Sequence, residues 1–354
     1  MIELQDISMK LLIVIVGTIG LTAFGIIFGL FYKGVDRKIS AHMQGRIGPP
    51  IRQPFRDIVK LFTKENIEPE NAIPWVFHLA PLIGLVGAIS ILLYLPIVPQ
   101  LNGGFSPLLS SSGDLILILY LLMIPSLAMV IGGFSSGSPY ATVGAQREMV
   151  TMIAYEFPLA IIIISIAYRI SRPDILSQTN NSNVFALSTI ASTPIWNYVG
   201  LWGFIGLILL LFVLVIVTPA ELSKIPFDST EAETEIAGGL LVEYSGRNLA
   251  MFYLTDGVKT VVMASLIIAL FFPHNLSSFF GLENYPAMIV DIIFYLIKVL
   301  LVILFSVTLI RVATARLKID QIVYTYWIPL TLISLIGLVL IIMDWSLGMG
   351  WIIN

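Results

Sequence analysis

Six carboxylates lie within 23 residues of one another, directly after a long apolar stretch. The six are Glu221, Asp228, Glu231, Glu233, Glu235 and Glu243. Lys224 is the only basic residue between positions 219 and 246. Closely packed acids resist ionising together, so a protonation change at one alters its neighbours. Such a cluster can relay charge or protons; the simpler interpretation is a solvated loop whose acids have no chemical task.

The spacing of these acids predicts a helix. Thr230 followed by Glu233 matches a capping box, so a helix is expected to begin near Glu231. On that helix Glu231 and Glu235 are four residues apart and share a face. Glu243 lies two turns beyond Glu235, about 80° round the axis.

The composition shows what kind of protein carries this cluster. The chain has 354 residues, of which 57% are hydrophobic and 12% charged, and its mean hydropathy is +0.94. A soluble domain is about 25% charged, so a polytopic membrane protein of the all-α class is predicted. The absence of cysteine excludes iron–sulfur clusters and Cys-type zinc from this chain. The net charge of −3 indicates no nucleic-acid partner, and no cleaved signal peptide is expected.

Eight apolar segments approach the length of about 20 residues that spans a bilayer. One helical domain, 1–354, is therefore predicted. If the N-terminus lies outside, the four inner loops hold 14 of the 19 basic residues, in agreement with the positive-inside rule. Both termini are then outside. The segments are 11–32, 75–98, 114–134, 147–168, 196–218, 248–272, 286–309 and 324–343, and the inner loops are 33–74, 135–147, 219–247 and 310–323.

The first inner loop, 33–74, contains an amphipathic pattern. Phe55, Ile58, Val59 and Phe62 recur at helical spacing in QPFRDIVKLFTKE, with charged residues between them. This pattern predicts a helix that lies at the membrane interface. The basic residues of the loop are candidates for docking a soluble partner or lipid phosphates. They are Arg37, Lys38, Arg46, Arg52 and Arg56.

Ionisable residues inside apolar segments are costly and are candidates for function. Glu156 lies about nine residues into the fourth segment, roughly 14 Å deep, and is expected to face a polar interior. Asp256 and Lys259 are three residues apart and are expected to pair on one helix face. Asp291 and Lys298, seven apart, also share a face. The simpler interpretation is that such pairs only ease insertion, and that Glu156 is a neutral hydrogen-bonding group.

The acidic segment resembles the loop of the H subunit of complex I, the membrane subunit that joins the redox arm to the membrane arm. The family pattern runs E-x-N-R-x-P-F-D-x-P-E-x-E-x-E-(I/L)-x-x-G and then E-Y-S-G. This chain reads ELSKIPFDSTEAETEIAGG and then EYSG, with Ser223–Lys224 in place of Asn-Arg. The matching residues are Glu221, Pro226, Phe227, Asp228, Glu231, Glu233, Glu235, Glu243, Tyr244, Ser245 and Gly246.

Two further stretches agree with the same family. DRKISAHMQGRIGP (36–49) resembles its E-R-K … Q-x-R-I-G-P, and RVATARLKIDQ (311–321) resembles its R-A-x-x-P-R-x-R-x-D-Q. Between RIGP and QPF only three residues stand here, whereas complex I has a longer stretch. This short RIGPPIRQPFRDIVKL is more similar to the equivalent subunit of group 4 membrane-bound [NiFe] hydrogenases and related sulfane reductases.

The resemblance implies a subunit that couples a ferredoxin-linked redox module in the cytoplasm to H⁺ or Na⁺ translocation. It implies Glu156 and the loop acids as the relay, with Asp256 and Lys259. It also implies partners that carry Fe–S clusters, a NiFe-hydrogenase-like large subunit, and antiporter-like membrane subunits, in a prokaryotic cell membrane. The chain itself would hold no cofactor and would be an enzyme only as a non-redox part of the complex.

Two alternatives remain open at this stage. The first is a quinone-reducing complex I subunit, which the short loop disfavours. The second is a stand-alone secondary ion transporter, because apolar spans with buried ionisable residues fit it equally well. The lack of internal repeats and of Gly/Pro-broken span pairs disfavours a transporter.

Overall fold

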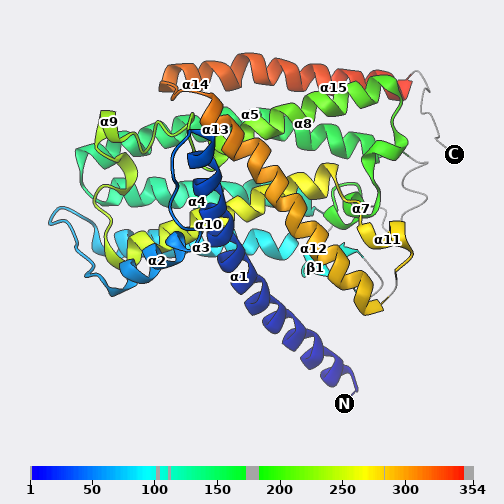
Figure 1. Cartoon of the computed structure of the whole chain (residues 1–354), viewed down its shortest axis with the longest axis horizontal. Helices are drawn as coiled ribbons and strands as arrows, with labels where there is room; N and C mark the ends of the chain where they lie inside the picture. Colours follow the sequence, from blue (N-terminus) through cyan, green and yellow to red (C-terminus); the bar gives the residue numbers. More distant parts are fainter. Residues whose placement is uncertain (1, 101–103, 111–112, 173–182, 283, 347–354) are drawn as a thin grey trace.

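The long apolar segments of the chain form long helices, arranged as one bundle in the computed structural model (Figure 1). The structure describes residues 2–100, 104–110, 113–172, 183–282 and 284–346. Within these residues, eight helices are long and apolar enough to cross a membrane. The eight are Leu11–Met43, Pro74–Tyr94, Asp114–Ser135, Pro139–Ile170, Leu201–Glu221, Gly246–Phe271, Asn284–Ala313 and Ile319–Ser346.

The predicted all-α class and the number of spans are confirmed, and two boundaries change by eight residues or more. The first span continues to Met43 rather than ending at 32, and the fourth begins at Pro139 rather than at 147. Both extensions are helical turns with polar residues, which a search for apolar runs leaves out. Glu156 therefore lies near the middle of a 32-residue helix.

Shorter elements stand between several of the spanning helices along the chain. The spanning helices are α1 (Ile2–Met43), α3 (Pro74–Tyr94), α4 (Asp114–Ser135), α5 (Pro139–Ile170), α8 (Leu201–Glu221), α10 (Gly246–Phe271), α12 (Asn284–Ile303) with η3 (Leu304–Thr308) and α13 (Leu309–Ala313), and α14 (Ile319–Thr325) with η4 (Tyr326–Leu330) and α15 (Thr331–Ser346). The shorter elements are α2 (Gln53–Thr63), β1 (Val98–Pro99), β2 (Phe105–Ser106), α7 (Leu187–Ser192), η1 (Ile195–Tyr198), α9 (Glu233–Ile236), η2 (Gly239–Leu241) and α11 (Leu276–Phe280). The strands β1 and β2 pair antiparallel, with Val98 opposite Ser106.

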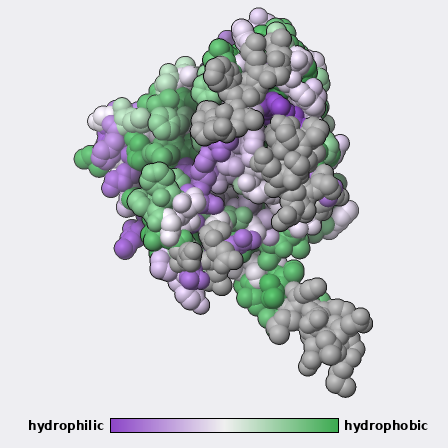
Figure 2. Space-filling view, turned by 90° about the vertical axis from the view of Figure 1, so that its right-hand side faces the viewer, coloured by the Kyte–Doolittle hydropathy of each residue, from purple (hydrophilic) through white to green (hydrophobic). Residues whose placement is uncertain are grey.

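The bundle has two ends that carry different elements. Helices α2 and α9 lie at one end, which we call the α2–α9 end, and α7 and α11 lie at the other, the α7–α11 end (Figure 1). Helices α1 and α12 cross the front of the bundle obliquely, and the N-terminal part of α1 extends away from it. In a view onto the α7–α11 end, hydrophobic residues lie at the edge of the bundle and on the protruding helix, beside polar residues on the end itself (Figure 2).

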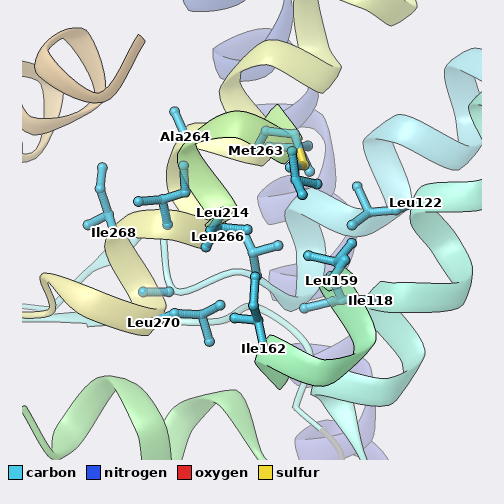
Figure 3. Packing of buried hydrophobic residues seen from close by; sticks show 14 of the residues in the cluster. Ile118, Leu122, Leu159, Ile162, Leu214, Met263, Ala264, Leu266, Ile268 and Leu270 are labelled. Atoms are coloured by element: carbon cyan, nitrogen blue, oxygen red, sulfur yellow. The ribbon is translucent and has the colours of Figure 1, made fainter. Parts of the chain in front are cut away.

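Helix α10 lies at the centre of the bundle and is the most completely buried of the described spanning helices. Its side chains Met263, Leu266 and Leu270 are almost completely buried. They pack against residues of α4, α5 and α8, among them Ile118, Leu122, Leu159, Ile162 and Leu214 (Figure 3). A charged side chain on α10 is therefore held deep inside the protein.

Two helix crossings depend on glycine. A Cβ on Gly29 of α1 would come within 2.4 Å of the Gly257 carbonyl oxygen of α10, and one on Gly206 of α8 within 2.8 Å of the Gly337 carbonyl oxygen of α15. Small residues let helix backbones approach closely inside a membrane, where dispersion contacts replace the hydrophobic effect. The first crossing fixes α1 against α10, and both helices carry charged residues described below; the second fixes α8, which ends at Glu221, against α15.

The amphipathic helix predicted after the first span is confirmed as α2, but its two apolar edges face different surroundings. Ile58 and Leu61 are buried against Leu30 of α1 and Leu254 of α10. Val59 is 65% exposed. Helix α2 is thus fastened to the bundle along one edge and offers the other to the membrane interface or a partner.

Candidate functional site

A buried ion pair joins the end of α8 to α10. Lys259 Nζ lies 2.8 Å from Glu221 Oε1, and the side chains are only 3% and 2% exposed. Lys259 also donates a hydrogen bond of 2.8 Å to Ser126 Oγ of α4, which lies 3.3 Å from the Tyr155 hydroxyl of α5. One cation therefore connects polar groups from three neighbouring helices inside the apolar core.

Two further carboxyls lie near this pair, both on α5. Glu148 is 2% exposed and Glu156 is half-buried. Each has one buried Oε1 atom without a hydrogen-bond partner among the described residues. The charges of Glu221 and Lys259 act on both carboxyls. Three acids therefore share the field of one lysine, which is the arrangement in which a proton on one carboxyl affects the others.

A second charged group lies closer to the α2–α9 end. Asp256 Oδ2 accepts from Lys224 Nζ at 2.6 Å and forms an ion pair with Lys33 Nζ at 2.5 Å. The predicted pairing of Asp256 with Lys259 is thus wrong. Residues three apart on a helix differ in direction by about 60°, and here Asp256 faces α1 and the loop after α8, whereas Lys259 faces α4 and Glu221.

A cavity of about 330 Å³ connects the two groups. Its wall contains both ion-pair systems and reaches the acidic segment 222–245. A polar cavity of this volume can hold ordered water molecules, which would bridge side chains that are not in direct contact. The acidic and basic residues in the wall are Lys33, Arg37, Glu221, Lys224, Glu231, Glu233, Asp256, Lys259 and Arg311.

The acidic segment does not form the predicted helix. The capping box of Thr230 and Glu233 is absent, since α9 begins at Glu233 after Ala232 without a side-chain cap and ends at Ile236. Ala237, Gly238 and Gly239 follow with positive φ of 54°, 100° and 55°, a conformation that ends helices. Residues 231 and 235 therefore do not share a helix face, and residue 243 lies in a turn beyond η2.

Two acids of this segment instead pair with different arginines. Asp228 accepts two hydrogen bonds, of 2.8 and 2.6 Å, from Arg316, which lies in the loop before α14. Glu235 pairs with Arg147 of α5 at 2.5 Å. Glu233 is exposed and Glu243 is partly exposed.

Glu231 and Glu233 are the loop acids in the cavity wall, and Glu231 is the more buried of the two. Burial raises the pKa of its carboxyl, an effect that Lys224 opposes and Asp256 adds to. Burial opposes the charge of Lys224, but the carboxylates of Asp256 and Glu231 outweigh it and raise the pKa of that lysine. Glu231 and Lys224 are therefore coupled through their protonation and lie between the loop surface and the buried pairs.

The basic residues of the first loop fall into two groups. Arg46, Arg52 and Arg56 are exposed at the α2–α9 end. Arg37 is held by Asp57 of α2 at 3.3 Å, and Lys38 is partly buried. Three of the five predicted docking residues are therefore free to contact another molecule, and Arg37 fastens α2 to α1.

Sequence reasoning missed Glu148, Lys33 and Arg316 as parts of this arrangement. The apolar run of the fourth span places Glu148 at the membrane edge, because it begins eight residues after the helix does. The distance of eight residues between Glu148 and Glu156, about 80° round a helix, could have indicated that the two face a similar direction. Lys33 and Arg316 carry no such signal, since their partners are far away in the chain.

The fold and these buried charges define a polytopic membrane protein with ionisable groups linked across its interior. Residues 16–342 match the NADH dehydrogenase family, and the chain belongs to that family. Its membership, with the eight apolar helices, makes it a multi-pass membrane protein of a family that supplies subunits to oxidoreductase complexes.

Relatives in several respiratory complexes cover nearly the whole chain. The chain is 28% identical over 363 residues to the H subunit of the F(420)H(2) dehydrogenase of Methanosarcina mazei, covering 99% of this chain and 97% of that protein. It is 30% identical over 327 residues to the H subunit of the NADH-quinone oxidoreductase of Brevibacillus brevis, covering 89% and 88%. A chain in the solved structure of the membrane-bound sulfane sulfur reductase, an archaeal respiratory membrane complex, is 26% identical with a TM-score of 0.77, covering 93% and 99%. The resemblance found in the motifs is thereby confirmed.

Proposed function

We propose that this chain couples a soluble redox module to the movement of H⁺ or Na⁺ across the membrane. The observation that carries the proposal is the cavity that joins the exposed acidic segment to the buried pair Glu221–Lys259. A chain whose only task was to anchor a soluble enzyme would not need three carboxyls around one buried lysine, because such groups are costly to insert.

The proposed sequence of events begins at the segment 222–245. A charge change in a docked redox module alters the protonation of Glu231, whose carboxyl is coupled to Lys224 and Asp256. This change alters the electrostatic potential at Lys259, whose ammonium lies 2.8 Å from the Glu221 carboxylate. Glu148 and Glu156 share the field of that lysine and respond by binding or releasing a proton.

Glu156 is the proposed exit of the relay from this chain. Its neighbours on α5, Ile153 and Phe157, are 52% and 60% exposed, so this face of the helix lies at the surface of the bundle. An antiporter-like membrane subunit docked on that face could exchange a proton with Glu156. The three exposed arginines, Arg46, Arg52 and Arg56, are the proposed contacts of the soluble module.

The redox module proposed is of the ferredoxin-linked hydrogenase or sulfane reductase type, with Fe–S clusters and in the hydrogenase case NiFe in the partner subunits. The short stretch between RIGP and QPF and the similarity to the sulfane reductase chain support this. The relative from Brevibacillus brevis supports a quinone-reducing complex as the second candidate. Turnover of the purified complex after removal of quinone distinguishes them: it continues in the first case and stops in the second.

Purification of the native complex tests the proposal as a whole. Mass spectrometry should identify a soluble Fe–S subunit and antiporter-like membrane subunits that co-purify with this chain. Sealed vesicles that contain the complex should take up H⁺ or Na⁺ when its electron donor is added, and an ionophore should abolish the gradient. Ion movement by the isolated chain without donor would instead support a secondary transporter.

A further inference from the structure

An apolar groove lies between α8, α10 and α12, away from the charged cavity. Its volume is about 470 Å³. Leu211 and Val215 of α8 form one wall and Ile267 of α10 the floor, while Leu301 and Phe305, 46% and 61% exposed, belong to the outer wall. All five residues belong to membrane-spanning helices, so the groove faces the hydrocarbon of the bilayer.

A lysine lies at the end of this groove nearest the α7–α11 end. Lys298 Nζ donates to the Phe272 carbonyl oxygen at 3.0 Å and to the His274 carbonyl oxygen at 2.9 Å, directly after α10 ends. It also lies 4.9 Å from the centre of the Phe294 ring. An ammonium has three donors, and these two carbonyls use two of them.

Lys298 does not pair with Asp291, contrary to the shared face expected from their spacing. Asp291 is buried and accepts hydrogen bonds from the backbone of Gly104 and from the backbone and hydroxyl of Ser277. The charge of Asp291 therefore acts on Lys298 only from a distance, and no carboxylate among the described residues is hydrogen-bonded to the ammonium. His274 lies next to Lys298 and part of its ring is exposed. Partial burial and the charge of Lys298 lower the pKa of this ring, which is therefore a neutral hydrogen-bonding group.

We propose that the groove binds one phosphate-bearing membrane lipid, with an acyl chain between α8, α10 and α12 and the phosphate on Lys298. Water does not fill an apolar groove stably, whereas the bilayer supplies acyl chains at this depth. From Lys298 to Phe305 the groove follows seven residues of helix, about 10 Å, which lies within one leaflet of a core about 30 Å thick. Lys298 itself lies midway along the span Asn284–Ala313, but its ammonium donates to carbonyls that directly follow α10. Helix α10 has 26 residues, about 39 Å, which exceeds the hydrocarbon core of about 30 Å, so the level of its end is that of the headgroups.

Charge favours a lipid over a helix of another subunit as the occupant. The groove is apolar along its length and positive at one end only. This distribution complements a molecule with one anionic end and one hydrocarbon end. A helix in the same place would have to supply a carboxylate at the level of Lys298 and apolar residues below it.

The absence of native cysteine allows a direct test in native membranes. A single Leu301→Cys substitution, labelled with a photoactivatable cross-linker, should yield an adduct of this chain with the mass of a phospholipid. Ile297→Cys provides the matched control, because Ile297 is one turn away on the same helix, is 47% exposed and does not line the groove. Its adducts should arise from the bulk lipid alone.

The lysine is tested in the same two backgrounds. Lys298→Met should reduce the lipid adduct at position 301 about fivefold, since an ion pair of this kind changes affinity by roughly that factor, and should leave the adduct at position 297 unchanged. Lys298→Arg should retain most of the adduct at 301. Yields are scaled to the amount of assembled chain, so a variant that folds poorly is recognised. A cross-link from 301 to another polypeptide, or a lipid adduct that Lys298→Met leaves unchanged, would overturn the proposal.

Discussion

Lys259 and Glu221 form a 2.8 Å ion pair inside the helix bundle, at the end of α8, with both side chains almost completely buried. Two charges in such a place must satisfy each other, because each loses its hydration. The pair also lies between the charged cavity and the two carboxyls of α5. The pair is a structural contact, and in the proposed relay it is also the step between the loop acids and the carboxyls of α5.

Removal of the lysine should destabilise the protein strongly. Lys259→Met leaves Glu221 without its cation, and breaking a buried pair from one side costs about 3–5 kcal/mol. The double variant Lys259→Met/Glu221→Gln should recover much of the loss, since no unpaired charge remains. Thermal unfolding of the purified complex measures both, with the exposed Lys318→Met as control. An unchanged melting temperature for Lys259→Met would contradict the buried pair.

Asp228→Asn should lower stability because of its contact with Arg316. The capping box predicted a helix that begins near Glu231, shortly after Asp228, but α9 begins only at Glu233. The carboxylate instead accepts two hydrogen bonds from Arg316. Loss of a partly exposed bidentate pair is expected to cost about 1–2 kcal/mol.

A double-mutant cycle separates the two explanations for Asp228. Arg316→Gln should cost a similar amount as Asp228→Asn, and the two losses should not add in the double variant. Additive losses would indicate that the residues act independently. Glu233→Gln, in an exposed position of the same segment, should have little effect.

Glu231 should make stability depend on pH. Burial raises the pKa of this carboxyl above its ordinary value of 4.5. Its contribution to folding is therefore fully present below that pH and is lost as pH rises through the raised pKa. Glu231→Gln should flatten this part of the melting-temperature profile, whereas exposed Glu233→Gln should leave it unchanged. Profiles that coincide for wild type and Glu231→Gln would show that the carboxyl is not coupled.

Arg46→Glu should release the soluble module, because Arg46 is exposed at the α2–α9 end in a loop rich in basic residues. Co-purification of the module with the membrane part, measured at increasing salt, should fail at lower ionic strength than in wild type. The control is Lys318→Glu, because Lys318 is exposed on another loop. Arg316→Glu is not suitable as a control, since Arg316 donates hydrogen bonds to Asp228. A complex of Arg46→Glu as salt-resistant as wild type would exclude this loop from docking.

The sequence predicts the spans well and the local contacts of charged residues poorly. The spans depend on apolar length, which the chain shows directly. The capping box at Thr230 failed because two glycines after Ala237 end the helix and bring the backbone of Gly239 against the carbonyl of Thr230. The four-residue capping motif therefore determines the local backbone conformation less than the glycine-containing turn that follows it.

The same limit explains the buried charges. Spacing along α10 suggested that Asp256 pairs with Lys259, but each has a stronger partner on another helix. These partners are far away in the chain, since Glu221 is separated from Lys259 by 38 residues and Lys33 from Asp256 by 223. Only the packing of the helices reveals them. The family resemblance located the region, and the structure located the contacts.

Ion pumping in vesicles that contain the Glu156→Gln complex tests the proposed relay most directly. Glutamine keeps the size of the side chain and one oxygen but cannot exchange a proton. Donor-driven ion uptake, scaled to the amount of assembled complex and to its redox turnover in detergent, should be lost in this variant and partly retained in Glu156→Asp. Uptake by Glu156→Gln equal to that of wild type would show that this carboxyl is a structural hydrogen-bonding group and would contradict the relay.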